Sequence, residues 1–341
     1  MTQQDGERRD HDPGDRPIVT NSRMWQSPRW TKVADTVFRR GAKPAFLNHP
    51  LLLTLRLLRA RSRYAVVVTS GSQVALLYGL LCRLLALPQK QVVVQLYLNE
   101  RRGLLRALDP LTRLVLRRAW GVIVNSRGEI GLLARRFGVP PERVRFVYYH
   151  TNIIEPELVE GRSGVVFAGG RNFRDYETLV DALRGLDLDA VIVCGRDHLL
   201  VSDAPDRVRI RREIPYPDYL EVLRQASIVV VPLSTETVPA GQVAILEAMA
   251  LGKPVVTTRG IGTVDYVRDG IDGLLYARGD AADLRRCIVT LAEDSSMRSR
   301  MGRAALASVQ SDLTFDRHVE ATIGALRSLV PEHAASRGIP S

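Results

Sequence analysis

Residues 228–258 read IVVVPLSTETVPAGQVAILEAMALGKPVVTT and predict a strand, a helix and a second strand in succession. The first run, 228–233, is apolar and rich in β-branched residues, as a buried strand requires. Gly241 then opens a helical segment over 241–251, and the apolar run 254–258 follows it. A strand, a helix and a strand in this order are typical of a βαβ unit in a parallel sheet.

The same rhythm continues in both directions along the chain. Further apolar runs of strand type occur at 17–21, 65–68, 91–98, 121–125, 144–149, 164–170, 190–195, 208–214 and 273–277. Segments with the length and apolar spacing of helices separate most of these runs. We therefore expect an α/β protein with two Rossmann-like, doubly wound domains facing across a cleft, and with a polar connection over 155–163.

The composition of the 341 residues excludes several classes of protein. With 45% hydrophobic and 25% charged residues, the chain is not collagen-like, coiled-coil or wholly disordered. Its three cysteines lie far apart, without the spacing of a disulfide framework or a structural zinc site. The N-terminal stretch lacks the apolar core of a secretory signal, so we expect a cytoplasmic protein.

Charge is distributed unevenly along the chain. Residues 1–150 carry 26 Lys or Arg and 10 Asp or Glu, a net charge of +16, whereas the remainder carries 22 and 27, a net charge of −5. Segments 49–63 and 101–118 place leucines at helical spacing with arginines between them. Such helices either lie on an anionic membrane surface or pack against a sheet as core helices. The shortage of acids favours peripheral membrane contact, and no aromatic residues interleave with the charges to indicate nucleic-acid binding.

Two residues of the opening segment are candidates for ligand binding. Gly241 allows the backbone to approach a ligand closely, and the free N–H groups at the start of the helix favour an anion. Glu247 stands among apolar neighbours inside the same helix. A buried carboxylate needs hydrogen-bond donors, and either the vicinal hydroxyls of a sugar or a neighbouring loop would supply them.

Three segments resemble a known family. GVVFAGGRNFRDYETLVDAL (164–183) and LEAMALGKPVV (246–256) resemble the donor-binding domain of GT-B glycosyltransferases, particularly family 4, and DGIDGLLYARGD (269–280) is similar to a further loop of that family. The resemblance implies a GT-B fold and the transfer of a sugar from a nucleoside diphosphate sugar, such as a UDP- or GDP-sugar, to a glycan, lipid-linked or small-molecule acceptor. It also implies that Glu247 holds the ribose of the nucleotide.

The resemblance also implies a domain organisation for the chain. An acceptor-binding domain is expected over 17–158 and a nucleotide-sugar-binding domain over 162–311. A C-terminal helix over 312–330 is expected to cross back to the first domain, as in similar folds. Residues 1–16 and 331–341 are expected to be tails, the first being rich in charged residues, glycine and proline.

One departure from the family concerns the loop before the helix. Retaining members carry a first glutamate eight positions before the second, and that position is Pro239 here. Glu236 could replace it only if the loop is rebuilt, so retaining stereochemistry does not follow from the resemblance. Residues 239–242 are expected instead to present backbone N–H groups and the Gln242 amide to the donor, which makes Gln242 a candidate catalytic residue.

The resemblance also places phosphate-binding cations after the first strand of the donor domain, where Arg171 and Arg174 stand. The arginine fork suits phosphate oxygens, and cations at a helix start need an anion because the helix dipole opposes them. Two solvated arginines would give the same sequence, and Arg196 is a weaker third candidate. The Asp187-Leu-Asp189 sequence precedes its strand and the histidines lack ligand spacing, so we expect no metal and no cofactor other than the sugar nucleotide.

The N-terminal domain offers one candidate general base, Glu100, which follows the predicted strand over 91–98. It could deprotonate an acceptor hydroxyl, or it could pair with Arg101 or Arg102 at the surface. Two other functions stay open at this point. A catalytically inactive sugar-nucleotide-binding subunit is suggested by Pro239, and a nucleotide-sugar epimerase has a similar fold but needs paired acids and a histidine that we do not find.

Overall fold

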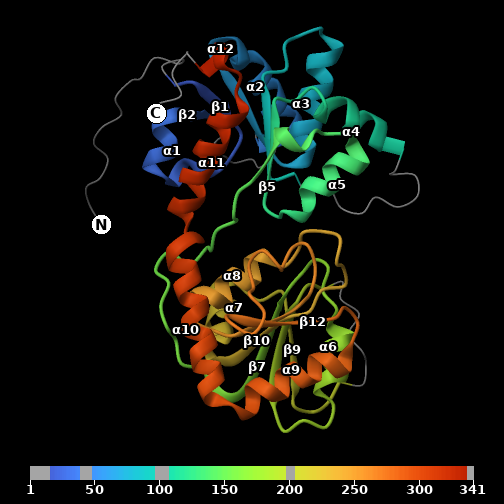
Figure 1. Ribbon diagram of the computed structural model, residues 1–341, viewed down its shortest axis with the longest axis vertical. Coiled ribbons are helices and arrows are strands. Elements are labelled where there is room, and N and C mark those ends of the chain that lie inside the picture. Colours follow the sequence, from blue (N-terminus) through green and yellow to red (C-terminus); the bar gives the residue numbers. More distant parts are fainter. Residues whose placement is uncertain (1–15, 39–47, 97–106, 197–203, 336–341) are drawn as a thin grey trace. The chain divides into compact units, whose positions relative to one another are not determined.

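The structure is a computed structural model that describes residues 16–38, 48–96, 107–196 and 204–335. The chain divides into two compact units, the first comprising Met1–Val124, Leu132–Arg145 and Val319–Ser341, and the second Asn125–Gly131 and Phe146–His318. Figure 1 shows helices packed around a sheet in each unit. The α/β architecture with two doubly wound sheets that the sequence predicts is therefore confirmed.

The first unit is built on a six-stranded sheet with the order β2-β1-β3-β4-β5-β6. Its strands are β1 (Ile18–Thr20), β2 (Ala34–Thr36), β3 (Val66–Ser70), β4 (Gln91–Val94), β5 (Gly121–Val124) and β6 (Val144–Phe146). The pairs from β2 through β5 are parallel. The helices in this part of the sequence are α1 (Pro28–Val33), α2 (Pro50–Ala60), α3 (Ser72–Leu84), α4 (Asp109–Leu116) and α5 (Gly128–Phe137), with α11 (Phe315–Leu329) and α12 (Glu332–Ala335) at the end of the chain.

The second unit contains a six-stranded sheet with the order β12-β11-β10-β7-β8-β9, and every neighbouring pair in it is parallel. Its strands are β7 (Arg162–Gly170), β8 (Asp189–Cys194), β9 (Val208–Arg212), β10 (Ala226–Val231), β11 (Val255–Thr258) and β12 (Gly273–Tyr276). Its helices are α6 (Tyr176–Leu183), α7 (Tyr216–Gln225), α8 (Gln242–Ala250), α9 (Ala281–Glu293) and α10 (Ser295–Asp312).

Burial of both faces explains why the strands read as continuous apolar runs. In β10, Ile228, Val229, Val230 and Val231 are all buried, although successive side chains point to opposite faces of the sheet. Residues of α8 pack on the face that contains Val229 and Val231, and residues of α6 and α9 pack on the face that contains Ile228 and Val230. Each sheet face therefore needs its own helical layer.

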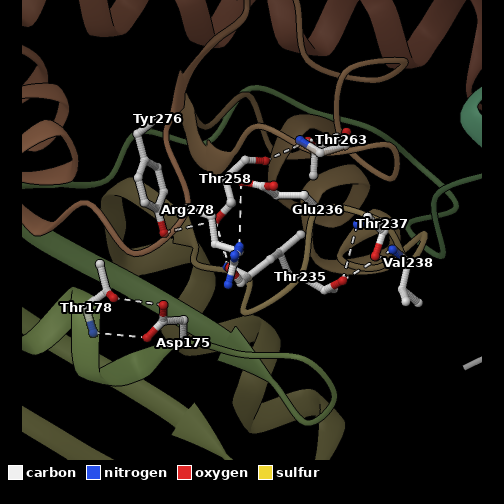
Figure 2. A network of polar contacts seen from close by, with 12 residues as sticks. Asp175, Thr178, Thr235, Glu236, Thr237, Val238, Thr258, Thr263, Tyr276 and Arg278 are labelled. Atoms are coloured by element: carbon white, nitrogen blue, oxygen red, sulfur yellow. Dashed lines mark hydrogen bonds and ion pairs between the residues drawn. The ribbon is translucent and has the colours of Figure 1, made fainter. Parts of the chain in front are cut away.

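Helix α6 shows how local sequence sets the start of an element. The Asp175 carboxylate accepts hydrogen bonds from the Thr178 backbone N–H at 3.1 Å and from its hydroxyl at 2.8 Å (Figure 2). This is the N-cap arrangement that satisfies the free N–H groups of a first turn. None of the helices in the described part of the chain combines the length and the apolar character needed to cross a bilayer.

Candidate functional site

The strand order of the second sheet defines one place where loops diverge. Strands β7 and β10 are neighbours, and the chain continues from β7 to β8 and β9 on one side but from β10 to β11 and β12 on the other. In open α/β sheets, ligands bind outside the carboxyl ends of the strands at such a switch point. The loop after β7 and the loop after β10 therefore form the first candidate site.

Backbone hydrogen bonds tie these two loops together. The Asp175 N–H donates to the Pro232 carbonyl oxygen at 3.1 Å, and the Ser234 N–H donates to the Phe173 carbonyl oxygen at 3.0 Å. Phe173 adopts a left-handed backbone with φ of 55°, which is uncommon for a residue with a side chain. The geometry of one loop thus depends directly on the other.

Gly241 ends the loop after β10 and forms the N-cap of α8. Its φ of 89° lies in the left-handed region, and a Cβ there would approach side chains of Leu233 and Val231 at 3.3 Å. Glycine is therefore required by the backbone conformation. The Gln242 side chain is half-buried at the first position of α8 and has no hydrogen bond among the described residues.

The loop before Gly241 is supported from two directions. The Thr235 hydroxyl accepts hydrogen bonds from the N–H groups of Thr237 and Val238, both at 3.3 Å (Figure 2). Gly262 packs so closely that a Cβ on it would lie 2.5 Å from the Ala240 nitrogen and 2.9 Å from the Pro239 Cα. The Pro239 position, where the resembling family has its first glutamate, is therefore packed closely against Gly262.

Glu236 does not take over that position. Its carboxylate lies 3.6 Å from the Arg278 guanidinium, and both side chains are half exposed (Figure 2). The Glu236 carbonyl oxygen accepts the Ile261 N–H at 2.9 Å, which fixes the backbone of the loop. The Glu236 side chain thus faces Arg278, while its backbone is tied to Ile261.

Glu247 lies in the second turn of α8 and is only 2% exposed. Its Oε1 accepts hydrogen bonds from the Tyr216 hydroxyl at 2.8 Å and from the Asn152 side-chain amide at 3.1 Å. Burial raises the pKa of Glu247, while hydrogen bonds from neighbouring hydroxyl and amide groups act in the opposite direction. A buried carboxylate with donors arranged around it is suited to receive further hydroxyl donors from a ligand.

The two arginines after β7 are placed differently. Arg171 is exposed and forms an ion pair with Glu213 at 3.1 Å. Arg174 donates through Nε to the Gly169 carbonyl oxygen at 3.0 Å and through Nη1 to the Asn172 carbonyl oxygen at 2.8 Å. Arg174 is half-buried, and burial lowers the pKa of its guanidinium.

Tyr219 connects the arginine with the glutamate. Burial and then the Glu247 carboxylate raise the pKa of Tyr219, whereas the Arg174 guanidinium acts in the opposite direction. A Cβ on Gly169 would lie 2.6 Å from the Tyr219 ring, so the ring packs against the end of β7. Arg174, Glu247 and the start of α8 thus belong to one neighbourhood at the switch point.

Other residues singled out from the sequence lie elsewhere or beyond the description. Glu100 lies outside the described residues. Arg196 is exposed after β8. Lys253, which follows α8, is buried, and its ammonium donates to the carbonyl oxygens of Val159 at 2.8 Å and Arg224 at 2.7 Å.

Tyr216, Tyr219 and Asn152 are site residues that the sequence did not reveal. Tyr216 and Tyr219 stand in the PYPDYL segment at the start of α7, where an amphipathic helix explains them equally well. Asn152 lies in the irregular connection before β7. In the part of the chain that the structure describes, no group of three or more His, Cys, Asp or Glu side chains is placed to hold a metal ion.

The first unit has a comparable switch point between β1 and β3. The Asn21 side chain donates to the Ser70 carbonyl oxygen and accepts from the Ser70 N–H, both at 2.8 Å. The Ser70 hydroxyl donates to the Gln95 side-chain oxygen at 2.8 Å. Polar side chains thus meet at the carboxyl ends of three adjacent strands of this sheet as well.

Comparison with protein families matches nearly the whole chain in two parts. Residues 157–294 match the family described as glycosyl transferases group 1, and residues 2–150 match the family described as glycosyl transferase 4-like domain. The chain therefore consists of two glycosyltransferase domains, a 4-like domain in its N-terminal half and a group 1 domain in its C-terminal half, as the sequence resemblance predicted.

Curated relatives agree with this assignment. A D-inositol 3-phosphate glycosyltransferase of Arthrobacter sp. is 32% identical over 220 residues, which cover 63% of this chain and 48% of the relative. The lipopolysaccharide core biosynthesis glycosyltransferase LpsE of Rhizobium meliloti is 34% identical over 145 residues, which cover 40% of this chain and 42% of the relative. The matched residues thus span less than half of the length of each of these two relatives.

Solved structures show the same fold. The Anabaena protein HepE, solved in complex with UDP and glucose, gives a TM-score of 0.68 at 18% identity and covers 87% of this chain and 86% of that chain. Sucrose-phosphate synthase from Thermosynechococcus elongatus gives a TM-score of 0.66 at 21% identity, with coverage of 86% and 83%. These similarities establish the expected GT-B fold for the chain.

Proposed function

We propose that this protein is a glycosyltransferase that moves a sugar from a nucleoside diphosphate sugar to an acceptor. The observation that carries the proposal is the buried carboxylate of Glu247, held by two donors at the switch point of the second sheet, where the half-buried Arg174 also lies on the loop after β7. The carboxylate suits a ribose diol and the guanidinium suits a diphosphate. Family membership and the HepE complex with UDP support this assignment, and UDP is the first nucleotide to test.

Departure of the diphosphate requires positive charge near the leaving oxygens. Arg174 and Arg171 are proposed to supply this charge together with the free N–H groups at the start of α8. Gly241 allows the diphosphate to approach that helix start closely. The reaction is therefore proposed to proceed without a metal ion, and full activity after treatment with a chelator is the expected result.

The acceptor and its activation form the remaining part of the proposal. Gln242, at the first position of α8, is proposed to donate its amide to the donor sugar, and Glu100 is proposed to take the proton of the acceptor hydroxyl. Gln242→Ala and Glu100→Gln are each expected to lower the turnover number more than nucleotide affinity. Unchanged turnover in either variant would remove that residue from the proposal.

Donor binding is tested first by thermal unfolding with UDP, GDP, ADP and dTDP and with the corresponding sugar nucleotides. A nucleotide at about 100 times its dissociation constant adds roughly 2.7 kcal/mol to the stability of the wild type. Glu247→Gln should weaken binding by about 10-fold to 100-fold, because it removes a charged acceptor. Glu293→Gln, an exposed change at the end of α9, is the matched control. A wild type that binds none of these nucleotides would contradict the proposal.

Turnover distinguishes this enzyme from its alternatives. A glycosyltransferase releases nucleoside diphosphate only when an acceptor is converted, apart from slow hydrolysis of the donor. An inactive subunit binds the donor without turnover, and an epimerase alters the free sugar nucleotide. Release of UDP from UDP-sugar in the presence of lipid-linked or cell-envelope glycan acceptors is therefore the second experiment.

We also propose that the first unit contacts an anionic membrane surface, which would bring a lipid-linked or cell-envelope acceptor to the enzyme. Helices α2 and α4 both pack against α3. Leucines that are exposed on or next to these helices are Leu51, Leu55, Leu84, Leu85, Leu108 and Leu111. Residues 48–96 contain no Asp or Glu at all, and arginines stand among the leucines. Exposed leucines with arginines and without acids are complementary to an anionic bilayer.

Flotation with lipid vesicles tests this surface. The wild type should bind phosphatidylcholine vesicles that contain phosphatidylglycerol, and binding should weaken as salt rises. Leu55→Ser and Arg59→Glu should each reduce binding, whereas Ile154→Ser, at a residue of the second unit that is 93% exposed, should not. Equal loss in all three variants, or dimerisation without vesicle binding, would contradict the membrane surface.

A further inference from the structure

The orientation of the Glu247 carboxylate is set by residues far away in the sequence. Tyr216 precedes it by 31 positions and Asn152 by 95, and the hydrogen bonds from both side chains end on the same oxygen, Oε1. An ionised carboxylate has about four acceptor positions, two on each oxygen. The two bonds use the capacity of Oε1. The Tyr219 hydroxyl also donates to the carboxylate, which leaves about one acceptor position, on Oε2, for a further donor.

The Tyr216 ring is held in place despite being 47% exposed. It stacks on the Tyr219 ring with centroids 6.0 Å apart and an interplanar angle of 14°. Tyr219 in turn makes an edge contact with Phe167 of β7, with centroids 5.3 Å apart. The hydroxyl of Tyr216 is therefore carried by a ring whose orientation is fixed through the core of the second unit.

The electrostatics of the neighbourhood make these donors important. Burial favours the protonated form of Glu247, and the hydrogen bonds from Tyr216, Asn152 and then Tyr219 favour the ionised form. Burial and the Glu247 carboxylate together raise the pKa of Tyr216, so its hydroxyl keeps its proton and remains a donor. The Glu247 charge also raises the pKa of Tyr149 and of Tyr219.

We infer that Tyr216 and Asn152 are positioning residues for donor binding, which hold Oε1 of Glu247 so that Oε2 accepts a hydrogen bond from the ribose of the nucleotide. This inference rests on the proposed function. It adds two residues from separate segments, one at the start of α7 and one in the connection before β7, to the ribose site. Neither residue needs to touch the nucleotide in order to act.

The test compares UDP with 2′,3′-dideoxy-UDP by isothermal titration on the full chain. The ratio of the two dissociation constants measures what the ribose hydroxyls contribute to binding. Tyr216→Phe removes only the hydroxyl, so it should reduce this ratio by about tenfold, and Asn152→Ala should also reduce it. General damage to the fold would weaken both nucleotides equally and leave the ratio unchanged.

Tyr266→Phe is the matched control, because the Tyr266 hydroxyl bonds the Asn125 carbonyl oxygen at 2.6 Å and the Tyr149 N–H at 2.9 Å without contacting Glu247. This variant should keep the wild-type ratio even if it unfolds at a lower temperature. A wild-type ratio retained in Tyr216→Phe, or tighter UDP binding by that variant, would overturn the inference while leaving the proposed function intact. A wild type that does not distinguish the two nucleotides would overturn the ribose site itself.

Discussion

His318 provides a stability prediction that depends on pH. The side chain is 3% exposed, its Nδ1 bonds the Tyr148 carbonyl oxygen at 2.6 Å, and its Nε2 is buried without a partner among the described residues. The His150 ring lies 4.9 Å away between centroids. Burial first, and then the charge of His150, lowers the pKa of His318 from 6.5 to about 4. The folded protein therefore holds a neutral imidazole that becomes charged on unfolding below pH 6.5.

The sign and size of the effect follow from proton linkage. Between pH 6.5 and 4 the unfolded chain binds a proton that the folded chain does not, so the free energy of unfolding falls as the pH is lowered. The shift of the His318 pKa from 6.5 to about 4 corresponds to about 3 kcal/mol of unfolding free energy, and about 2 kcal/mol of this is lost by pH 5. For a unit of this size, 2 kcal/mol corresponds to a change of roughly 4–8 °C in melting temperature.

Scanning calorimetry of the wild type and His318→Asn at pH 7.5 and pH 5 measures this effect. Asparagine can keep a donor toward the Tyr148 carbonyl oxygen but does not titrate. The variant should be less stable at pH 7.5, because ring contacts are lost, yet its melting temperature should fall less between the two pH values. His49→Asn, at an exposed histidine, should leave the pH dependence of the wild type unchanged. Equal pH dependence in wild type and His318→Asn would refute the reasoning.

Three further predictions concern the second unit. Burial lowers the pKa of Lys253 from 10.5 to about 8, so between pH 8 and pH 10.5 only the unfolded chain keeps the proton. The free energy of unfolding of the wild type should therefore rise by about 3 kcal/mol over this pH range. Lys253→Met should lack this rise in urea titrations at a series of pH values. Gly262→Ala places a Cβ 2.5 Å from the Ala240 nitrogen, so it should cost roughly 1–3 kcal/mol and weaken UDP binding in titration calorimetry. Asp175→Ala removes the N-cap of α6 and should cost about 1 kcal/mol in the same urea titrations.

Much of the fold could be predicted from the sequence because parallel strands and their helices have strong local patterns. The errors lie at element ends, where single backbone conformations decide. Helix α6, for example, ends at Leu183, because Arg184 leaves the helical region and Gly185 adopts a φ of 72°, which no apolar pattern reveals. The strand predicted over 144–149 ends at Phe146, and the Tyr149 N–H bonds the Tyr266 hydroxyl instead of a neighbouring strand.

The candidate site could be predicted only as far as its residues share one segment. Gly241 and Glu247 stand in a strand, loop and helix whose pattern is visible in about twenty residues, so their relation was accessible from the sequence. The donors to Glu247 come from two other segments, and no periodicity connects Tyr216 or Asn152 with it. Tyr216 and Asn152 can be identified as donors to Glu247 only when it is known which loops the strand order brings to the same edge of the sheet.

In the basic N-terminal half, the sheet topology determines which of the arginine-rich helices lie side by side. Right-handed crossovers place consecutive helices on the same side of a sheet when the strand order advances in one direction, as it does from β2 through β3 and β4 to β5. Helices α2, α3 and α4 therefore form one layer and present their arginines and leucines together. Helix packing alone accounts for the buried Leu53 and Leu57 of α2, but it leaves Leu51 and Leu55 exposed on the same helix. An outward apolar stripe of this kind favours a partner surface over a purely structural layer.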